Sequence, residues 1–178
     1  MHDTVTIRPE ESSDHPAIRD VVAAAFGSAA EADLVDRIRA SPEYLPGGAL
    51  VAVDADGAIV GHVMISGAQL RSDDGSERPI VMLSPLAVSP HLHGRGIGGA
   101  LVRAANAVAD ELGEPFVVLE GAPAYYSRFG YEPASAHGIT MPLPDWAPPE
   151  AAQLYRLRND DPALAGQVIY PAAFDGVD

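Results

Sequence analysis

The sequence contains no cysteine and no lysine. Without cysteine the chain has no disulfide framework, thiol nucleophile or thiolate metal site. Without lysine it has no Walker-type phosphate loop, because the terminal lysine of that motif contacts the phosphates. There is also no apolar run near 18 residues, and the amino terminus lacks the basic-then-apolar pattern of a signal peptide. We therefore expect a cytoplasmic protein without a membrane partner.

Positive charge is scarce. Twenty-five acidic residues oppose eleven arginines, for a formal net charge of −14 at pH 7. Nucleic-acid binding requires cations that neutralise phosphates, so this balance argues against a nucleic-acid partner. An anionic ligand would be held by backbone amides or by a few local arginines. The length of 178 residues and the 47% hydrophobic content predict one domain, residues 1–178, with a substantial core.

Hydrophobic periodicity and turn residues predict alternating groups of helices and strands. Two helices come first. The first starts at Ser12 or Ser13 and ends at Gly27, and the second opens with a capping box from Ser28 to Glu31. Pro85 predicts a bulge or an edge in its strand. The remaining predicted elements are strands at 4–8, 49–53, 58–70 and 78–88, a helix at 97–112, a strand at 116–119, a short helix at 123–130, and tail strands at 153–157 and 167–170.

The glycine-rich turn at 93–99 lies between a predicted strand and a predicted helix. Its exposed N–H groups and the positive end of the helix dipole would bind an anion such as a diphosphate. Gly94, Gly96 and Gly99 also fit the dinucleotide pattern G-x-G-x-x-G, with Glu120 as a ribose-binding acid. However, hairpins precede the turn where a dinucleotide fold would have repeated βαβ units. A third interpretation is a tight corner with no ligand.

Two motifs carry a resemblance to a known family. Residues 86–99 resemble the acetyl-coenzyme A (acetyl-CoA) motif of the GNAT superfamily of N-acetyltransferases, [QR]-x-x-G-x-[GA], with Gly96 and Gly98 at its glycine positions. His93 departs from this motif, because it stands where the family usually has Gln or Arg. Residues 123–131 resemble P-x-Y-Y-x-x-F-G-[FY], found in a bacterial branch of predicted N-acetyltransferases. The resemblance is strongest over residues 4–135, and residues 136–178 form C-terminal strands and a tail.

The resemblance implies an α/β (α+β) fold with a mixed, mostly antiparallel central sheet flanked by helices. A splayed parallel strand pair in this fold forms the cofactor cleft. It also implies acetyl-CoA as acyl donor and no metal. The strand residues Leu86 and Val88 would offer backbone groups to pantetheine, and an N–H near Leu86 would stabilise the reacting carbonyl. The expected cofactor-binding residues are Leu86, Ala87, Val88, His93, Gly94, Arg95, Gly96, Ile97, Gly98 and Gly99.

Two catalytic residues are expected. Tyr126 matches the family position that donates a hydrogen bond or proton to the departing thiolate, whereas Tyr125 points elsewhere and favours a core role. Glu120 ends the strand beside the cleft and is the candidate for the general base or for acceptor binding. Glu31 is expected in the capping box, with acceptor binding as the alternative, and His62 as a buried hydrogen-bonded histidine. Arg103 is expected on a solvated helix face, with a local positive charge near the anion as the alternative.

The predicted function is direct transfer of an acetyl group from acetyl-CoA to an amine acceptor. The acidic field favours a small-molecule or peptide acceptor that is cationic. A rival hypothesis is a noncatalytic acyl-CoA-binding sensor or partner module, and a remote one is a dinucleotide-binding oxidoreductase. The resemblance also implies a homodimer.

Overall fold

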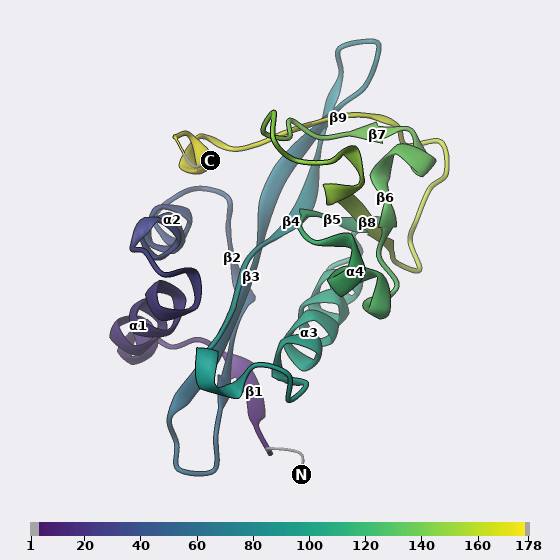
Figure 1. The fold of residues 1–178 in the computed structure, drawn as a ribbon. Helices are drawn as coiled ribbons and strands as arrows, with labels where there is room; N and C mark the ends of the chain where they lie inside the picture. The colour runs from purple at the N-terminus through teal and green to yellow at the C-terminus, as the bar shows by residue number, and fades with distance from the viewer. Residues whose placement is uncertain (1–3, 177–178) are drawn as a thin grey trace.

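The computed structural model describes residues 4–176, within which nine strands form one sheet (Figure 1). The strands run in the order β1-β2-β3-β4-β5-β8-β6, and β9 pairs with β3 and β7. The strands are β1 Thr6–Pro9, β2 Tyr44–Val53, β3 Ile59–Arg71, β4 Glu77–Val88, β5 Phe116–Glu120, β6 Glu132–Pro133, β7 Ile139–Thr140, β8 Ala152–Arg156 and β9 Gly166–Ile169. The α-helices are α1 His15–Phe26, α2 Ala30–Arg39, α3 Ile97–Glu111 and α4 Pro123–Tyr126.

The sheet separates two groups of helices. Helices α1 and α2 cover one face, and α3 covers the other (Figure 1). Most neighbouring strands are antiparallel, while β4–β5 and β7–β9 are parallel. This arrangement confirms the predicted mixed, mostly antiparallel sheet between helices.

The parallel pair β4–β5 separates soon after it forms. Its paired residues are Val81 with Val117 and Met82 with Val118, yet β4 continues to Val88. On its other edge β4 remains paired with β3, where a register shift lies opposite Ser84 and Pro85. Across this shift β3 advances two residues while β4 advances three, which is the signature of a β-bulge. The predicted bulge and splayed strand pair are therefore confirmed.

Two local predictions need correction. Helix α2 begins at Ala30 with Ala29 as its N-cap, so the predicted capping box does not form. Because the helix starts two residues after Ser28, that hydroxyl accepts the nearer N–H of Ala30 and donates to the Glu31 carboxylate. Strand β2 begins at Tyr44, five residues before the predicted start at Ala49. In contrast, Gly27 ends α1 in the left-handed conformation as predicted, with a φ of 72°.

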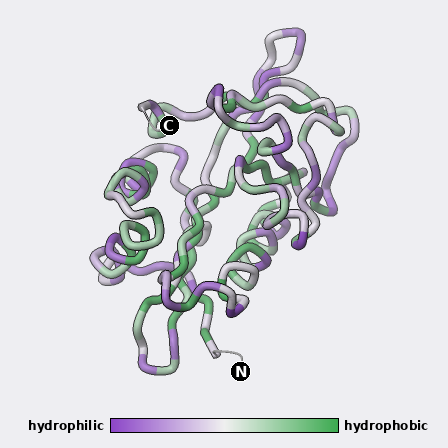
Figure 2. Tube along the Cα trace, viewed as in Figure 1, coloured by the Kyte–Doolittle hydropathy of each residue, from purple (hydrophilic) through white to green (hydrophobic). Residues whose placement is uncertain are grey.

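Hydrophobic side chains fill both faces of the sheet, and the hydrophobic segments follow the strands (Figure 2). One cluster lies under α3, a second lies under α1 and α2, and a third joins β5, β8 and β9. Within the first cluster, the buried Tyr131 hydroxyl donates a 2.7 Å hydrogen bond to the Asn106 side chain of α3. This bond fixes the segment after α4 against the helix that follows the glycine turn.

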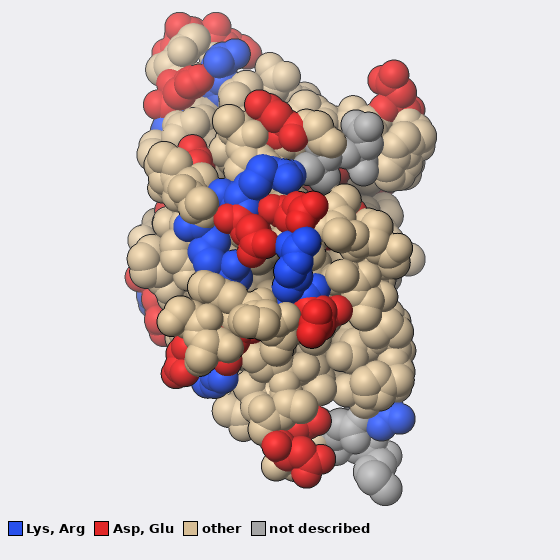
Figure 3. Space-filling view, turned by 90° about the vertical axis from the view of Figure 1, so that its left-hand side faces the viewer, with Lys and Arg blue, Asp and Glu red and all other residues tan. Residues whose placement is uncertain are grey.

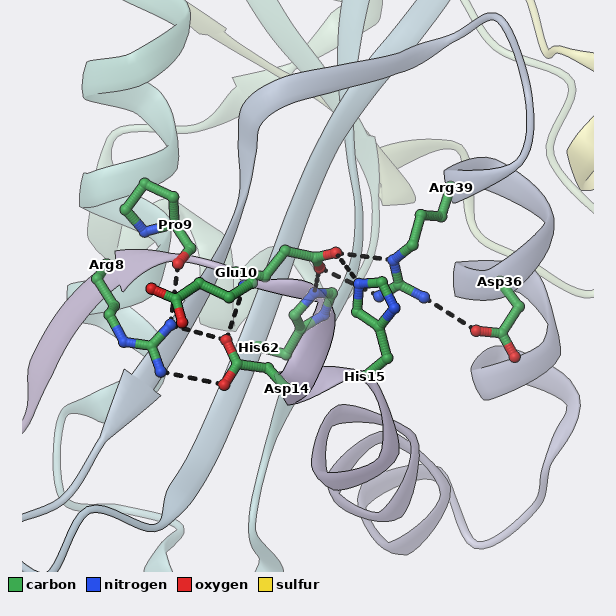
Figure 4. A network of polar contacts seen from close by, with 9 residues as sticks. Arg8, Pro9, Glu10, Asp14, His15, Asp36, Arg39 and His62 are labelled. Atoms are coloured by element: carbon green, nitrogen blue, oxygen red, sulfur yellow. Dashed lines mark hydrogen bonds and ion pairs between the residues drawn. The ribbon is translucent and has the colours of Figure 1, made fainter.

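A buried polar network connects the residue after β1 to strand β3 and helix α2 (Figure 4). The Glu10 carboxylate, 2% exposed, lies 2.9 Å from Nε2 of His62 and 2.7 Å from Nε of Arg39. Burial alone would raise the pKa of Glu10, but the hydrogen bonds from His62 and Arg39 lower it to about 2. His62 is fully buried and hydrogen-bonded to Glu10, as predicted, and burial lowers its pKa.

The Glu10 network predicts acid sensitivity. Because the pKa of Glu10 is depressed in the folded state, its stabilising contribution is complete above pH 4.5 and is lost as the pH falls toward about 2. Between pH 6 and pH 3 we expect Glu10→Gln to lose about 2 kcal/mol less unfolding free energy than the wild type. Urea titrations at the two pH values measure this difference. Glu77→Gln, which alters an exposed ion pair with Arg71, should retain the wild-type pH dependence. An equal change in unfolding free energy between the two pH values in all three proteins would contradict the prediction.

Candidate active site

A cleft of about 510 Å³ opens at the carboxyl end of β4 and the amino end of α3. The end of α1 forms one wall, and the aromatic segment around α4 forms the other. The lining residues are Ala25, Phe26, Leu86, Ala87, Val88, Leu92, His93, Gly94, Gly96, Ile97, Gly98, Gly99, Arg103, Tyr125, Arg128 and Phe129. Nine of the ten residues expected to bind the cofactor are therefore in one cleft, and Arg95 is the exception.

The glycine turn has a backbone that other residues adopt only with strain. Gly94 and Gly96 have φ values of 80° and 85°, in the left-handed region. Gly96 precedes α3, and its carbonyl accepts the first intrahelical bond from Ala100. The N–H groups of Ile97, Gly98 and Gly99 come before that bond and have no partner within the helix. Together with the helix dipole they give this end of the cleft an electrostatic environment that suits an anion.

Close packing explains the other two glycines of the turn. A side chain at Gly98 would overlap the Tyr125 hydroxyl, and a β-carbon at Gly99 would lie 2.7 Å from Cε1 of Phe129. The rings of Tyr125 and Phe129 themselves meet edge to face, with centroids 5.2 Å apart. The aromatic segment therefore rests directly on the first turn of α3. This contact brings the two motifs recognised in the sequence into one site.

His93 connects the turn to the strand before it. Its Nε2 lies 2.8 Å from the Val88 carbonyl oxygen. A carbonyl only accepts hydrogen bonds, so this ring nitrogen carries the hydrogen and donates. The side chain at the position where the motif usually has Gln or Arg thus fixes the turn to the end of β4. Its other contribution is to line the cleft.

The lining part of β4 has one open edge. Leu86, Ala87 and Val88 pair with β3 on one side, while the register with β5 ends at Met82. Backbone N–H and C=O groups of a strand alternate between its edges, so this stretch presents both kinds of group to the gap. An extended ligand that carries amide groups can pair with such an edge as an added strand would.

The two tyrosines of α4 point in different directions. Tyr125 lines the cleft, whereas the Tyr126 ring packs where a side chain at Gly121 would stand, just past the end of β5. Tyr126 also contacts Tyr131, with ring centroids 5.8 Å apart. Burial, with a smaller contribution from Tyr125, raises the pKa of Tyr126 above its ordinary value. The Tyr126 phenol therefore stays protonated, and it lies beside Gly121 and Tyr131, outside the lining of the cleft.

Glu120 is exposed at the end of β5 and is also outside the lining. The hydroxyl of Tyr170, which follows β9, donates a hydrogen bond to its carboxylate. Burial raises the pKa of Tyr170, and the Glu120 carboxylate raises it further, so the phenol remains a donor. Sequence reasoning missed this pair because the two residues are 50 positions apart and belong to no common motif.

Comparisons with known proteins agree with this geometry. The acetyltransferase (GNAT) domain family matches residues 6–134. The chain is also 36% identical over 155 residues to the uncharacterized N-acetyltransferase YhbS of Escherichia coli K12, covering 86% of this chain and 88% of the relative. The chain belongs to the GNAT acetyltransferase family. This GNAT membership confirms the predicted N-acetyltransferase class.

Solved structures of relatives show the same GNAT fold. A structure of Escherichia coli YhbS in complex with CoA has a TM-score of 0.88 and 32% identity, and the match covers 100% of this chain and 96% of that one. A GNAT acetyltransferase from Brucella melitensis in complex with acetyl-CoA has a TM-score of 0.77 and 32% identity, with coverage of 98% and 100%. The predicted GNAT-like architecture is confirmed.

Residues 4–176 also bear on the expectations about metals and membranes. That stretch contains no group of three or more His, Cys, Asp or Glu side chains that could hold a metal ion. None of its helices is long and apolar enough to span a bilayer. The antiparallel hairpins before the glycine turn also differ from the repeated βαβ units that a dinucleotide-binding oxidoreductase requires.

Proposed function

We propose that this GNAT protein transfers an acetyl group from acetyl-CoA directly to a primary amine. The observation that carries the proposal is the meeting of two features in one cleft, the open edge of β4 and the anion-binding start of α3. Acetyl-CoA is the acyl donor, and it has chemistry suited to both. Its diphosphate is an anion for the glycine turn, and its pantetheine arm carries amides for the strand edge.

Each part of the donor has a proposed partner. Leu86, Ala87 and Val88 would hold pantetheine through their backbone, and residues 93–99 would hold the diphosphate. Within that range the N–H groups of the helix start supply most of the attraction, because the protein as a whole is strongly acidic. His93 would act by fixing the turn to Val88. Arg95 is outside the lining, so we propose that it contributes charge at longer range.

In the proposed reaction the acceptor nitrogen attacks the thioester carbonyl carbon and forms a tetrahedral intermediate. A backbone N–H near Leu86 stabilises the oxygen, which becomes negative. The carbon–sulfur bond then breaks and the attacking nitrogen gives up a proton to water, leaving an amide and the CoA thiolate. Tyr126 donates a hydrogen bond to that sulfur. Its raised pKa makes full proton transfer to a thiolate unfavourable, so stabilisation through the hydrogen bond is its main effect.

The acceptor amine must lose a proton before it attacks. An alkylammonium with a pKa of about 10.4 requires roughly 4–5 kcal/mol to reach the free amine at pH 7. Glu120, at the end of β5, is the proposed base or cation-binding group. The hydrogen bond from Tyr170 fixes the direction of its carboxylate. An exposed carboxylate in this position also suits a cationic acceptor, whether a small molecule or a peptide amine.

Glu120→Gln tests this assignment. We expect kcat/KM for the amine at pH 7 to fall about tenfold, because the variant cannot accept a proton, while the affinity for CoA is unchanged. The deficit should shrink as the pH approaches the amine pKa, where the acceptor is already neutral. Steady-state kinetics from pH 7 to pH 10 measures both effects. Glu111→Gln, an exposed carboxylate at the far end of α3, is the control. An unchanged kcat/KM in Glu120→Gln would remove Glu120 from the mechanism.

One experiment separates the enzyme from a noncatalytic acyl-CoA sensor. Titration calorimetry measures the affinity for acetyl-CoA, and a thiol-release assay measures transfer to a panel of small amines and peptide amino termini. The proposal requires binding together with thiol release that depends on the amine. Binding without such release from any amine would favour the sensor.

We further propose that residues 1–178 form one N-acetyltransferase domain. Support comes from the tail, because β8 and β9 join the same sheet as the strands of the family match. A cytoplasmic location, a homodimer, and the absence of nucleic-acid and membrane partners remain predictions from the sequence.

A further inference from the structure

Two arginines line the cleft beyond the glycine turn. Arg103 belongs to α3, and Arg128 belongs to the short 3-10 helix Ser127–Phe129 that follows α4. Both guanidinium groups stack on the same ring. The Arg103 Cζ lies 5.1 Å from the Phe129 centroid and the Arg128 Cζ lies 5.3 Å from it. Arg128 also stacks on Tyr125 at 4.7 Å.

These arginines lack the carboxylate partners that others on the surface have. The face formed by α1 and α2 shows arginines interleaved with acidic residues (Figure 3). There Arg19 pairs with Asp33 and Asp36 at 2.6 and 2.8 Å, and Arg39 pairs with Glu10 at 2.7 Å. Among residues 4–176, by contrast, neither Arg103 nor Arg128 forms an ion pair with a carboxylate. In a chain with a net charge of −14, two unneutralised cations in one cleft indicate an anionic ligand.

The stacking holds the guanidinium groups of Arg103 and Arg128 in position before a ligand binds. Rings hold the guanidinium planes by cation–π attraction, while the N–H groups at the edges stay available to acceptors. Arg128 is fixed further, because its Nε donates to the Tyr125 carbonyl at 3.3 Å. A guanidinium held in this way loses little side-chain freedom when it binds a phosphate, and arginine suits phosphate geometry because its donors form a planar fork.

The location of Arg103 and Arg128 relative to the glycine turn indicates which anion they can contact. From Gly99 to Arg103 is one helical turn, or about 6 Å along α3. The glycine turn already serves the diphosphate of CoA under the proposed function. CoA carries one more phosphate, on the 3′ oxygen of its ribose, across a single sugar ring from the diphosphate. We infer that Arg103 and Arg128 form the recognition site for this ribose 3′-phosphate and select CoA over its dephosphorylated form. This inference rests on the proposed function.

The test compares the binding of two ligands by titration calorimetry. The probes are CoA and 3′-dephospho-CoA, which share the diphosphate and pantetheine and differ in the one phosphate. We expect the wild type to bind CoA at least tenfold more tightly, as one charge-assisted contact would give. This preference should fall toward unity in the double variant Arg103→Gln/Arg128→Gln and should weaken as salt is raised. The affinity for 3′-dephospho-CoA should change little, which also reports that the variant is folded.

Arg71→Gln is a control for the loss of an arginine charge, because it removes one from β3 at a site outside the cleft. It should keep the wild-type preference for CoA. Equal affinities of the wild type for the two ligands would overturn the inference, and so would an equal loss of both affinities in the double variant, since the arginines would then serve the diphosphate. Failure of the wild type to bind either ligand would instead overturn the proposed function.

Discussion

Replacing Gly96 by valine is expected to lower the affinity for CoA more than a hundredfold. Gly96 has a φ of 85°, a conformation that costs an L-residue about 1–2 kcal/mol and a β-branched residue more. It also lines the cleft at the N-cap of α3, with nothing within 4 Å of the place where a β-carbon would stand. A valine would therefore either occupy the space of the diphosphate or rotate the N–H groups away from it.

The control for this variant separates the effect of backbone strain on stability from the loss of CoA affinity. Gly57, in the turn between β2 and β3, has a φ of 84° and equally open surroundings. Gly57→Val should thus lose similar stability while it keeps its affinity for CoA. Titration calorimetry gives the affinities, and thermal unfolding gives the stabilities. Wild-type affinity in Gly96→Val would mean that the turn does not hold the diphosphate.

Replacing Tyr126 by phenylalanine is expected to lower kcat about a hundredfold, the typical effect of removing one hydrogen-bond donor to a developing negative charge. The change removes the hydroxyl that we propose as donor to the departing sulfur but leaves the ring that packs beside Gly121 and Tyr131. Because Tyr126 is outside the lining of the cleft, CoA affinity should change little. Single-turnover kinetics and calorimetry measure the two quantities separately.

Tyr125→Phe is the matched comparison, since it deletes the hydroxyl that rests on Gly98 inside the cleft. We expect it to affect CoA affinity more than kcat. The reverse result, with kcat lost only in Tyr125→Phe, would transfer the donor role to Tyr125. The pH dependence adds a check, because the raised pKa of Tyr126 means that the wild type should show no loss of this donor below pH 10.

Periodicity and turn chemistry were sufficient to predict most of the elements. The apolar spacing of α3 and the glycines before it are local signals in the sequence. Local patterns also predicted the tail strands β8 and β9, with bounds correct to within one residue. The start of β2 was missed because Pro46, Gly47 and Gly48 have the composition of a loop. Pairing of Tyr44 with Ser66 extends the strand through them, and such long-range pairing is invisible in a local window.

The cofactor cleft was more predictable than the catalytic residues. Backbone N–H groups at a glycine turn follow from the local sequence, so residues 93–99 could be assigned to an anion. The sequence favoured a solvated helix face for Arg103, but its stacking on Phe129 depends on how α3 meets a segment 26 residues later. The bond between Glu120 and Tyr170 likewise depends on how the tail crosses the sheet.

The separation of β4 from β5 has a consequence for protein engineering. Substitutions that fill cavities and tighten packing are a standard route to higher thermostability. In this protein such changes around Ser84 and Pro85 would draw together β4 and β5, whose divergence provides the proposed edge for the donor. A gain in thermostability from such changes would therefore lower kcat. Stabilising designs are better directed to the β3–β4 turn at residues 72–76 or to the surface of α2, away from that edge.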